Sequence, residues 1–219
     1  GFHIDIDALG RAITQSTRAI FFATPNNPTG VVATPEALSA VAALARRHDL
    51  WVVVDEVYAD LTFERAHVSI ASLPGMAERT VTISSLSKSH AMTGWRCGWA
   101  IGPEALVRHI DNLCLAMNYG LPGFIQQAAL VALEAGEAEV ARMREVYRRR
   151  RDLMLGALAN APGIRCLEPE AGMFMLIDVS RSGLSAKDYS WRLFRDTGVG
   201  VLDASPFGPS GGSSVVRSN

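Results

Sequence analysis

Residues 51–58 read WVVVDEVY, an apolar run that ends in a polar cluster. The uninterrupted, mostly β-branched run over 51–54 is typical of a strand that is buried on both faces of a parallel sheet. Asp55 follows the strand directly, so its carboxylate is at least partly desolvated and needs a cationic partner. The stretch therefore predicts a buried strand of an α/β sheet with a functional acid at its carboxyl end.

Two more apolar runs in this part of the chain end in the same way. Residues 19–23 (AIFFA) lead into the turn sequence TPNNPTG at 24–30, and residues 80–83 (TVTI) lead into SSLSKSHAMTGWR at 84–96. Helix signals lie between the first two strands, where Thr34 is the expected N-cap and the helix extends to about residue 48. Strand, helix and strand in this order predict an α/β sheet with crossover connections.

The remaining chain predicts a second, smaller domain. We expect a strand at 97–101 and helices at 103–117, 124–135 and 137–160, then a strand at 173–179, a helix at 185–196 and a short strand at 199–202. A loop rich in Pro, Gly and Ser at 205–214 leads to Arg217. The change of pattern predicts a large domain over residues 1–145 and an α+β domain over residues 146–219.

Composition narrows the function classes. The net charge of −1 gives no overall basic field for nucleic acid, and the arginines at 148–151 are interpreted as a solvated helix face. No apolar run reaches the roughly 18 residues that span a bilayer, so no membrane segment is expected. The three cysteines and five histidines lack metal-ligand spacing, which predicts no metal site, and the unpaired cysteines fit a reducing cytoplasm.

Three strand ends carry functional groups that suit an aldehyde cofactor with a phosphate. In an open α/β sheet the ligand crevice lies at the carboxyl ends of the strands, where Asn27, Asp55 and Lys88 are predicted. The Lys88 amine can form a Schiff base, and the nearby hydroxyls and Arg96 can hold the phosphate. Asp55 can pair with a protonated pyridine nitrogen, while Asn27 and Tyr58 can donate to a phenolate oxygen.

Each of these residues also has an ordinary structural interpretation. Lys88 could be a surface lysine in a Ser-rich loop, and Asp55 could pair with a structural arginine or cap a helix. Asn27 lies in a sequence that forms a good turn on any protein, and Tyr58 could be a half-buried tyrosine without a role. The functional interpretation gains weight because the clusters follow three successive predicted strands.

The motifs NPTG at 27–30, DEVY at 55–58 and SLSK at 85–88, with Arg96, resemble the signature of class I/II aminotransferases, which are fold-type I enzymes that use pyridoxal 5'-phosphate (PLP). The order and spacing agree over about 70 residues. Segments 72–77, 87–96 and 143–153 are most similar to the arginine:pyruvate transaminase branch. The resemblance implies part of a three-layer α/β/α large domain, followed by a smaller, truncated α+β domain.

The resemblance also assigns roles to single residues. Lys88 would form the Schiff base and then serve as the acid/base of the proton shift, and Asp55 would pair with the pyridinium nitrogen. The remaining implied ligands are Asn27 and Tyr58 for the ring 3'-oxygen and Ser85, Ser87 and Arg96 for the phosphate. Arg217 is the implied ligand of the substrate α-carboxylate, and Asn27 is a second implied substrate-binding residue.

The implied activity is transamination between an amino acid and a 2-oxo acid, in a protein that forms a homodimer. A PLP-dependent β-lyase shares the same residues, and an aminotransferase-like effector domain of a transcription regulator is a third reading. Both ends of the chain look cut, and the N-terminal half of the family's cofactor domain is absent. The isolated chain is therefore expected to bind PLP weakly and to aggregate.

Overall fold

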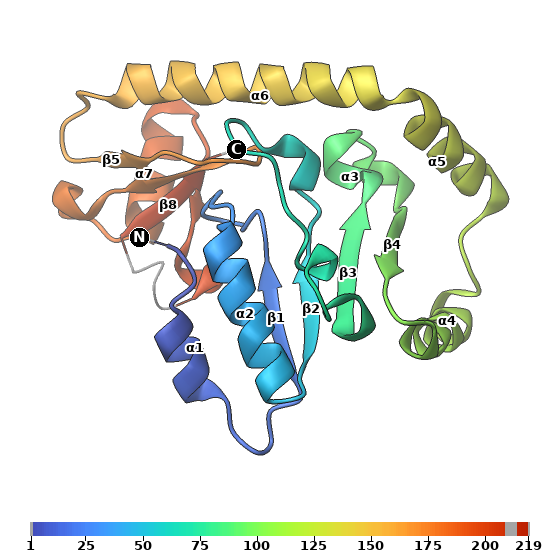
Figure 1. Ribbon diagram of the computed structural model, residues 1–219. Helices are drawn as coiled ribbons and strands as arrows, with labels where there is room; N and C mark the ends of the chain where they lie inside the picture. Colours follow the sequence, from blue (N-terminus) through green and yellow to red (C-terminus); the bar gives the residue numbers. More distant parts are fainter. Residues whose placement is uncertain (1, 209–213, 219) are drawn as a thin grey trace.

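The structure is a computed structural model, and it describes residues 2–208 and 214–218. Two separate four-stranded sheets make up its framework. The 22-residue helix α6 (Glu137–Leu158) runs along one side of the molecule and passes both sheets (Figure 1). The boundary predicted between residues 145 and 146 falls inside this helix.

The first sheet contains the motifs. Its strands are β1 (Ala19–Ala23), β2 (Trp51–Asp55), β3 (Thr80–Ser85) and β4 (Gly98–Ile101), in the order β1-β2-β3-β4. The first three strands are parallel, and β4 is antiparallel to β3. Ala23 pairs with Asp55, and Asp55 pairs with Ile83, so the carboxyl ends of the three parallel strands form one edge.

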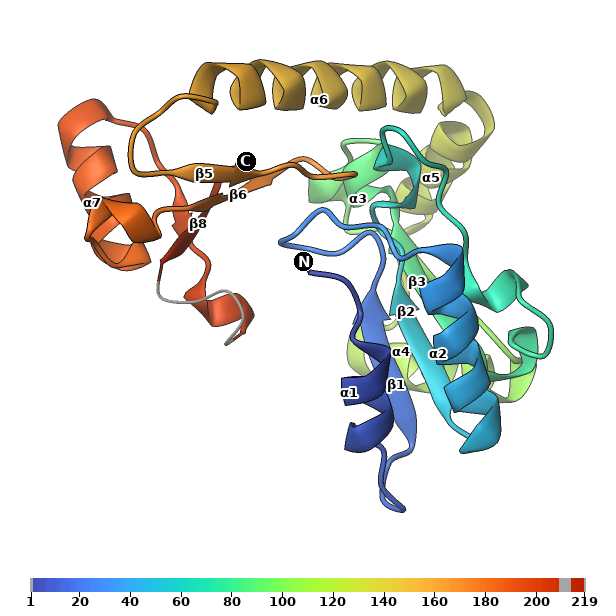
Figure 2. The ribbon, with the colours of Figure 1, turned by 60° about the vertical axis from the view of Figure 1, so that its left-hand side comes forward.

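Helices cover one face of this sheet. Helix α2 (Pro35–Arg47) begins where Thr34 accepts a hydrogen bond from the Ala37 amide (3.2 Å), and it packs against β1 and β2 together with α1 (Ile6–Ala12). Figure 2 shows both helices beside β1 and β2. Val52 and Val54 are fully buried in this core.

The opposite face differs from the expectation of burial on both sides. Phe21 is 70 % exposed and Ile83 is 38 % exposed, because no described helix packs over them. The mixed α/β architecture is the expected one, but within the described residues only one of the two helical layers is present on this sheet.

The second sheet is antiparallel and has the order β5-β6-β8-β7. Its strands are β5 (Arg165–Leu167), β6 (Met175–Asp178), β7 (Leu202–Asp203) and β8 (Val215–Ser218). Helix α7 (Ala186–Thr197) packs on it through Ala186 and Tyr189. Strand β5 was not predicted, and β7 begins three residues later than the expected 199, because Gly198 and Gly200 flank Val199 and interrupt the run.

The other elements connect the sheets. Helices α4 (Glu104–Asn118) and α5 (Gly123–Ala135) follow β4, and α3 is described with the site. Short 3₁₀ turns occupy Ala59–Leu61, Ile70–Ser72, Ala77–Arg79, Thr93–Trp95, Ser180–Ser182 and Ser205–Phe207. None of the described helices is long and apolar enough to cross a membrane, and no group of three or more potential metal ligands occurs in the same part of the chain.

Gly30 lies where the two halves of the chain meet, which leads to a stability prediction. Its φ is +70°, and an added Cβ would lie 2.4 Å from the Pro169 Cβ and 2.9 Å from the Ala171 carbonyl oxygen. Gly30→Ala should lower the free energy of unfolding by about 2 kcal/mol or more in urea titrations of the full-length protein. Gly156→Ala, in α6 with open space at its Cβ, should leave stability unchanged or higher. Equal unfolding midpoints for the two variants would contradict this.

Candidate functional site

The site lies at the carboxyl edge of β1, β2 and β3. Backbone hydrogen bonds continue past the strands: the Thr24 amide donates to the Asp55 carbonyl (3.0 Å), and the Glu56 amide donates to the Ile83 carbonyl (2.9 Å). The segments that follow the three strands therefore start side by side. This brings the turn with Asn27, the Asp55 cluster and the Lys88 segment to one edge of the sheet, as the sequence predicted.

Lys88 lies in a single helical turn, α3 (Leu86–Ser89), rather than in the loop expected from its Ser-rich sequence. Ser85 caps the turn, because its hydroxyl accepts a hydrogen bond from the Ser87 amide (3.3 Å). The Leu86 amide donates to the Cys97 carbonyl (3.2 Å), and Leu86 is fully buried beneath the turn. The half-buried Lys88 is thus held on a fixed piece of backbone together with Ser85 and Ser87.

The Asp55 carboxylate has spare hydrogen-bonding capacity. It is half-buried, and its Oδ1 accepts a hydrogen bond from the Val57 amide (3.0 Å). It makes no ion pair with any residue among 2–208 and 214–218. A carboxylate that is partly desolvated and lacks a cation favours a protonated nitrogen as its partner. This observation fits the pyridinium nitrogen of PLP.

Tyr58 is buried beside Asp55. Its ring packs edge-on against Phe174, with the ring centroids 5.2 Å apart. Burial raises the pKa of the Tyr58 phenol, the positive charge of Arg217 opposes that shift, and the negative charge of Asp55 adds to it. A raised pKa keeps the phenol protonated at neutral pH, so Tyr58 is a hydrogen-bond donor there.

Arg217 reaches this edge from the second sheet. Its Nη1 donates to the Asn27 Oδ1 (3.0 Å), and its guanidinium lies 5.6 Å from the Phe174 ring centre and 5.3 Å from that of Phe207. Its Nε is buried and has no hydrogen-bond partner in the described structure. A buried guanidinium N–H without an acceptor is costly, and a ligand carboxylate would satisfy it. Asn27 keeps its amide NH₂ group for a further acceptor.

Arg96 differs from the other predicted residues in its contacts. It has a left-handed conformation (φ 53°), it is exposed, and its Nη1 donates to the Thr93 carbonyl (3.0 Å). No hydrogen bond joins it to Ser85 or Ser87 in the described part of the chain. Gly98 pairs with Ser85, so Arg96 lies two residues from the partner of the strand end that precedes Lys88.

Two aromatic residues of the site were not predicted. Phe174 contacts both Tyr58 and Arg217, and Phe207 lies against Arg217. The segment around Phe174 (MFMLIDV, 173–179) reads as an ordinary buried strand, so its sequence carries no signal of a functional contact. Phe207 lies in the stretch rich in Pro, Gly and Ser at 205–214, and this composition carries no signal of a contact with Arg217.

Comparisons with known proteins identify the family of the chain. The model of the family "Aminotransferase class I and II" matches residues 1–217. The chain is 50 % identical over 215 residues to arginine–pyruvate transaminase AruH of Pseudomonas aeruginosa, covering 98 % of this chain and 55 % of that protein. It is 39 % identical over 210 residues to an aspartate aminotransferase of Musicola paradisiaca, covering 94 % and 52 %.

Solved structures show the same similarity. N-succinyldiaminopimelate aminotransferase from Mycobacterium tuberculosis superposes with a TM-score of 0.93 at 35 % identity, covering 99 % of this chain and 57 % of that one. The chain thus spans about half the length of the relatives it matches, and members of their family use PLP. Because the family model matches residues 1–217, and the strand-end residues are arranged as described above, the chain belongs to the class I and II aminotransferases.

Proposed function

We propose that the full-length protein is a PLP-dependent aminotransferase that transfers an amino group from an amino acid to a 2-oxo acid. One arrangement supports this proposal most strongly. A carboxylate with no cationic partner among the described residues (Asp55), a protonated phenol (Tyr58) and a lysine (Lys88) share one sheet edge, to which Arg217 extends. The family match supports the same reaction.

The residues of the site suit the parts of PLP. The cofactor supplies an aldehyde that bonds an amine and a ring that withdraws electrons. Asp55 would keep the ring nitrogen protonated, which maintains that withdrawal. Tyr58 and the Asn27 amide would donate to the ring oxygen, and the Ser85 and Ser87 hydroxyls, with Arg96, would hold the phosphate.

Lys88 and Arg217 would act on the substrate. The Lys88 amine would bind the cofactor aldehyde, and as a free amine it would accept the proton of the substrate Cα. Arg217 would bind the α-carboxylate through two parallel N–H groups, including the Nε that has no partner among the described residues. This fixes the orientation of the Cα–H bond relative to Lys88.

The proposal extends to partners and location. Amino acids and 2-oxo acids are the proposed substrates, and a homodimer is the proposed assembly. Exposed apolar residues on α4 and α5, with Met117 74 % and Phe124 71 % exposed, support an association surface. The three cysteines are free thiols, which supports a location in the cytoplasm.

Chemical trapping tests the proposal directly. Reduction of the PLP-loaded full-length protein with borohydride should attach the cofactor permanently to Lys88, which peptide mass spectrometry detects. Lys187, an exposed lysine on α7, is the internal control and should stay unmodified. Cofactor attached to Lys187 or to any other lysine of the full-length protein, with none at Lys88, would contradict the proposal. Product analysis separates the lyase alternative, because a lyase releases ammonia and pyruvate instead of a new amino acid.

A further inference from the structure

Arg151 is a buried cation whose contacts reach far beyond its own helix. Its side chain is only 7 % exposed, although it belongs to a run of four arginines that the sequence suggested was a solvated face. Its Nη1 and Nη2 donate to the two carboxylate oxygens of Glu64 (2.9 and 2.5 Å), and Nε donates to Asp152 (2.9 Å). Its guanidinium lies 4.7 Å from the centre of the Phe63 ring. The pKa of Arg151 is raised, mainly by its hydrogen bonds to the Glu64 carboxylate, so the guanidinium stays charged.

Arg151 also contacts residues 169–172, which we call the strap. Nη1 also donates to the Pro169 carbonyl (3.2 Å), and this bond is buried. Arg151 therefore joins α6 both to the strap and, through Glu64, to the segment that follows β2. A cavity of about 110 Å³ lies between the Arg151 side chain, Met154 and Phe174. Hydrogen bonds from Arg151 therefore contribute to holding α6 to the strap, beside the packing of Tyr147 against the apolar cluster that includes Phe174.

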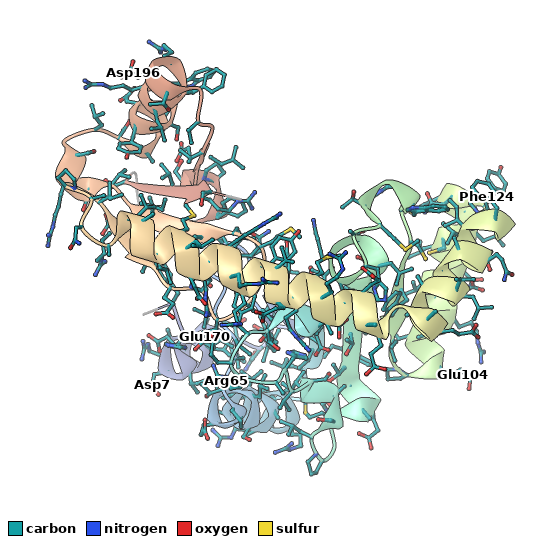
Figure 3. The ribbon with its side chains drawn as sticks, turned by 90° about the horizontal axis from the view of Figure 1, so that it is seen from above. Asp7, Arg65, Glu104, Phe124, Glu170 and Asp196 are labelled. Atoms are coloured by element: carbon teal, nitrogen blue, oxygen red, sulfur yellow. The ribbon has the colours of Figure 1, made fainter. Side chains whose placement is uncertain are left out.

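The strap is hydrogen-bonded to the segments around the first sheet through Glu170 and Gly172. The Glu170 amide donates to the Gly30 carbonyl, the Phe63 amide to the Glu170 carbonyl, and the Gly172 amide to the Leu61 carbonyl (each 3.0 Å). The Glu170 carboxylate also accepts hydrogen bonds from the Val32 amide (2.7 Å) and from Arg65 (2.8 Å). Glu170 and Arg65 form an ion pair (2.8 Å) and lie side by side in Figure 3.

The strap leads directly to the residues that hold Arg217. Phe174 lies two residues after Gly172 and contacts both Tyr58 and Arg217. Strand β6 begins at Met175, and its Leu176 pairs with Arg217 on β8. Because a paired strand moves with its neighbour, the position of the strap sets how far Arg217 extends toward Asn27.

We propose that Arg151 is a positioning residue: by clamping the strap to Glu64, it sets the position of Arg217 relative to Asn27 and Tyr58, and thereby the affinity for a substrate carboxylate. The expected effect on substrate affinity rests on the proposed function. The contacts by which Arg151 holds the strap do not depend on it. A misplacement of the guanidinium by about 1 Å is enough to cost a large part of two-pronged carboxylate binding.

Kinetics of the PLP-loaded full-length protein test the consequence. Arg151→Met should raise the KM for L-alanine and for L-arginine at least about tenfold and change kcat less than about threefold. Arg151→Lys keeps the charge but loses the fork, so it should give a smaller shift in the same direction. Arg150→Met is the matched control: Arg150 is its exposed neighbour, its guanidinium lies over Tyr147, and this variant should leave KM unchanged.

Amide hydrogen exchange of the cofactor-free full-length protein tests the clamp independently of activity. In Arg151→Met the Phe63 and Gly172 amides should exchange at least about tenfold faster, while the amides of β2 keep their protection. Glu64→Gln, at a carboxylate that is 58 % exposed, gives the same test if Arg151→Met does not fold.

Two outcomes would overturn the inference. The first is a KM in both Arg151→Met and Glu64→Gln that equals the KM of the Arg150→Met control. The second is an increase in amide exchange that is spread evenly over the chain in Arg151→Met, which indicates general destabilisation. Failure of the wild-type protein to bind PLP would instead remove the proposed function and leave the exchange experiment to decide on the clamp.

Discussion

Replacing Lys88 by alanine in the full-length protein should lower kcat/KM by at least about 10⁴-fold. The variant loses both the amine that bonds the aldehyde and the base that moves the Cα proton, and no other lysine of this chain lies on the same sheet edge. The fold should tolerate the change, because Leu86, and not the half-buried Lys88, is the buried anchor of α3. Steady-state assays with an amino acid and a 2-oxo acid measure the effect.

Lys187→Ala is the control for this experiment. Lys187 is the other lysine of the chain, and it lies exposed in the first turn of α7 on the second sheet. This variant should keep full activity, and the visible absorption of the bound cofactor should shift in Lys88→Ala alone. If Lys88→Ala retains both the wild-type absorption and the turnover, the assignment of Lys88 is wrong.

Arg217→Lys should lower kcat/KM about 100-fold, although the positive charge is kept. A lysine ammonium cannot reproduce the planar fork, in which Nη1 is bound to Asn27 while the buried Nε is left for a carboxylate. The loss should appear for all amino acids, because the α-carboxylate is common to them. It should also appear mainly in KM, since the cofactor residues are unchanged.

Arg165→Lys is a matched control from the same sheet. Arg165 pairs with Asp178 at 3.3 Å across neighbouring strands, and its side chain is 71 % exposed. An exposed pair of this kind contributes little, so the variant should behave as wild type. Equal kcat/KM values for Arg217→Lys and Arg165→Lys would show that Arg217 has no role in carboxylate binding.

The local parts of this architecture were predictable. Strands were predicted at 19–23, 51–54 and 80–83 and are observed at 19–23, 51–55 and 80–85. They and the helix with its cap at Thr34 follow from runs of neighbouring residues, because strand and cap preferences act over a few positions. The prediction that Asn27, Asp55 and Lys88 meet also needed little more than the rule that parallel strands end at a common edge.

The predictions that differed depended on what packs above an element. Residues 51–54 were predicted to form a strand buried on both faces, but Trp51 is 39 % exposed because residues 2–208 and 214–218 cover only one face of the sheet. The Ser-rich segment around Lys88 read as a loop, yet Ser85 caps a helical turn that the buried Leu86 fastens. Arg151 was interpreted as part of a solvated helix face. It is buried instead because Glu64 and Phe63, from a distant segment, pack against it, and the local sequence does not show this.

The identity of the chemical groups and their order along the chain could therefore be taken from the sequence, since a motif is a local property. The contacts that orient these groups depended on the tertiary structure. The hydrogen bond between Arg217 and Asn27 joins residues 190 positions apart, and that between Arg151 and Glu64 joins residues 87 positions apart. A contact over such a separation depends on how two sheets and a long helix pack together. No short stretch of residues encodes that packing, so the strap and its clamp became visible only in the folded molecule.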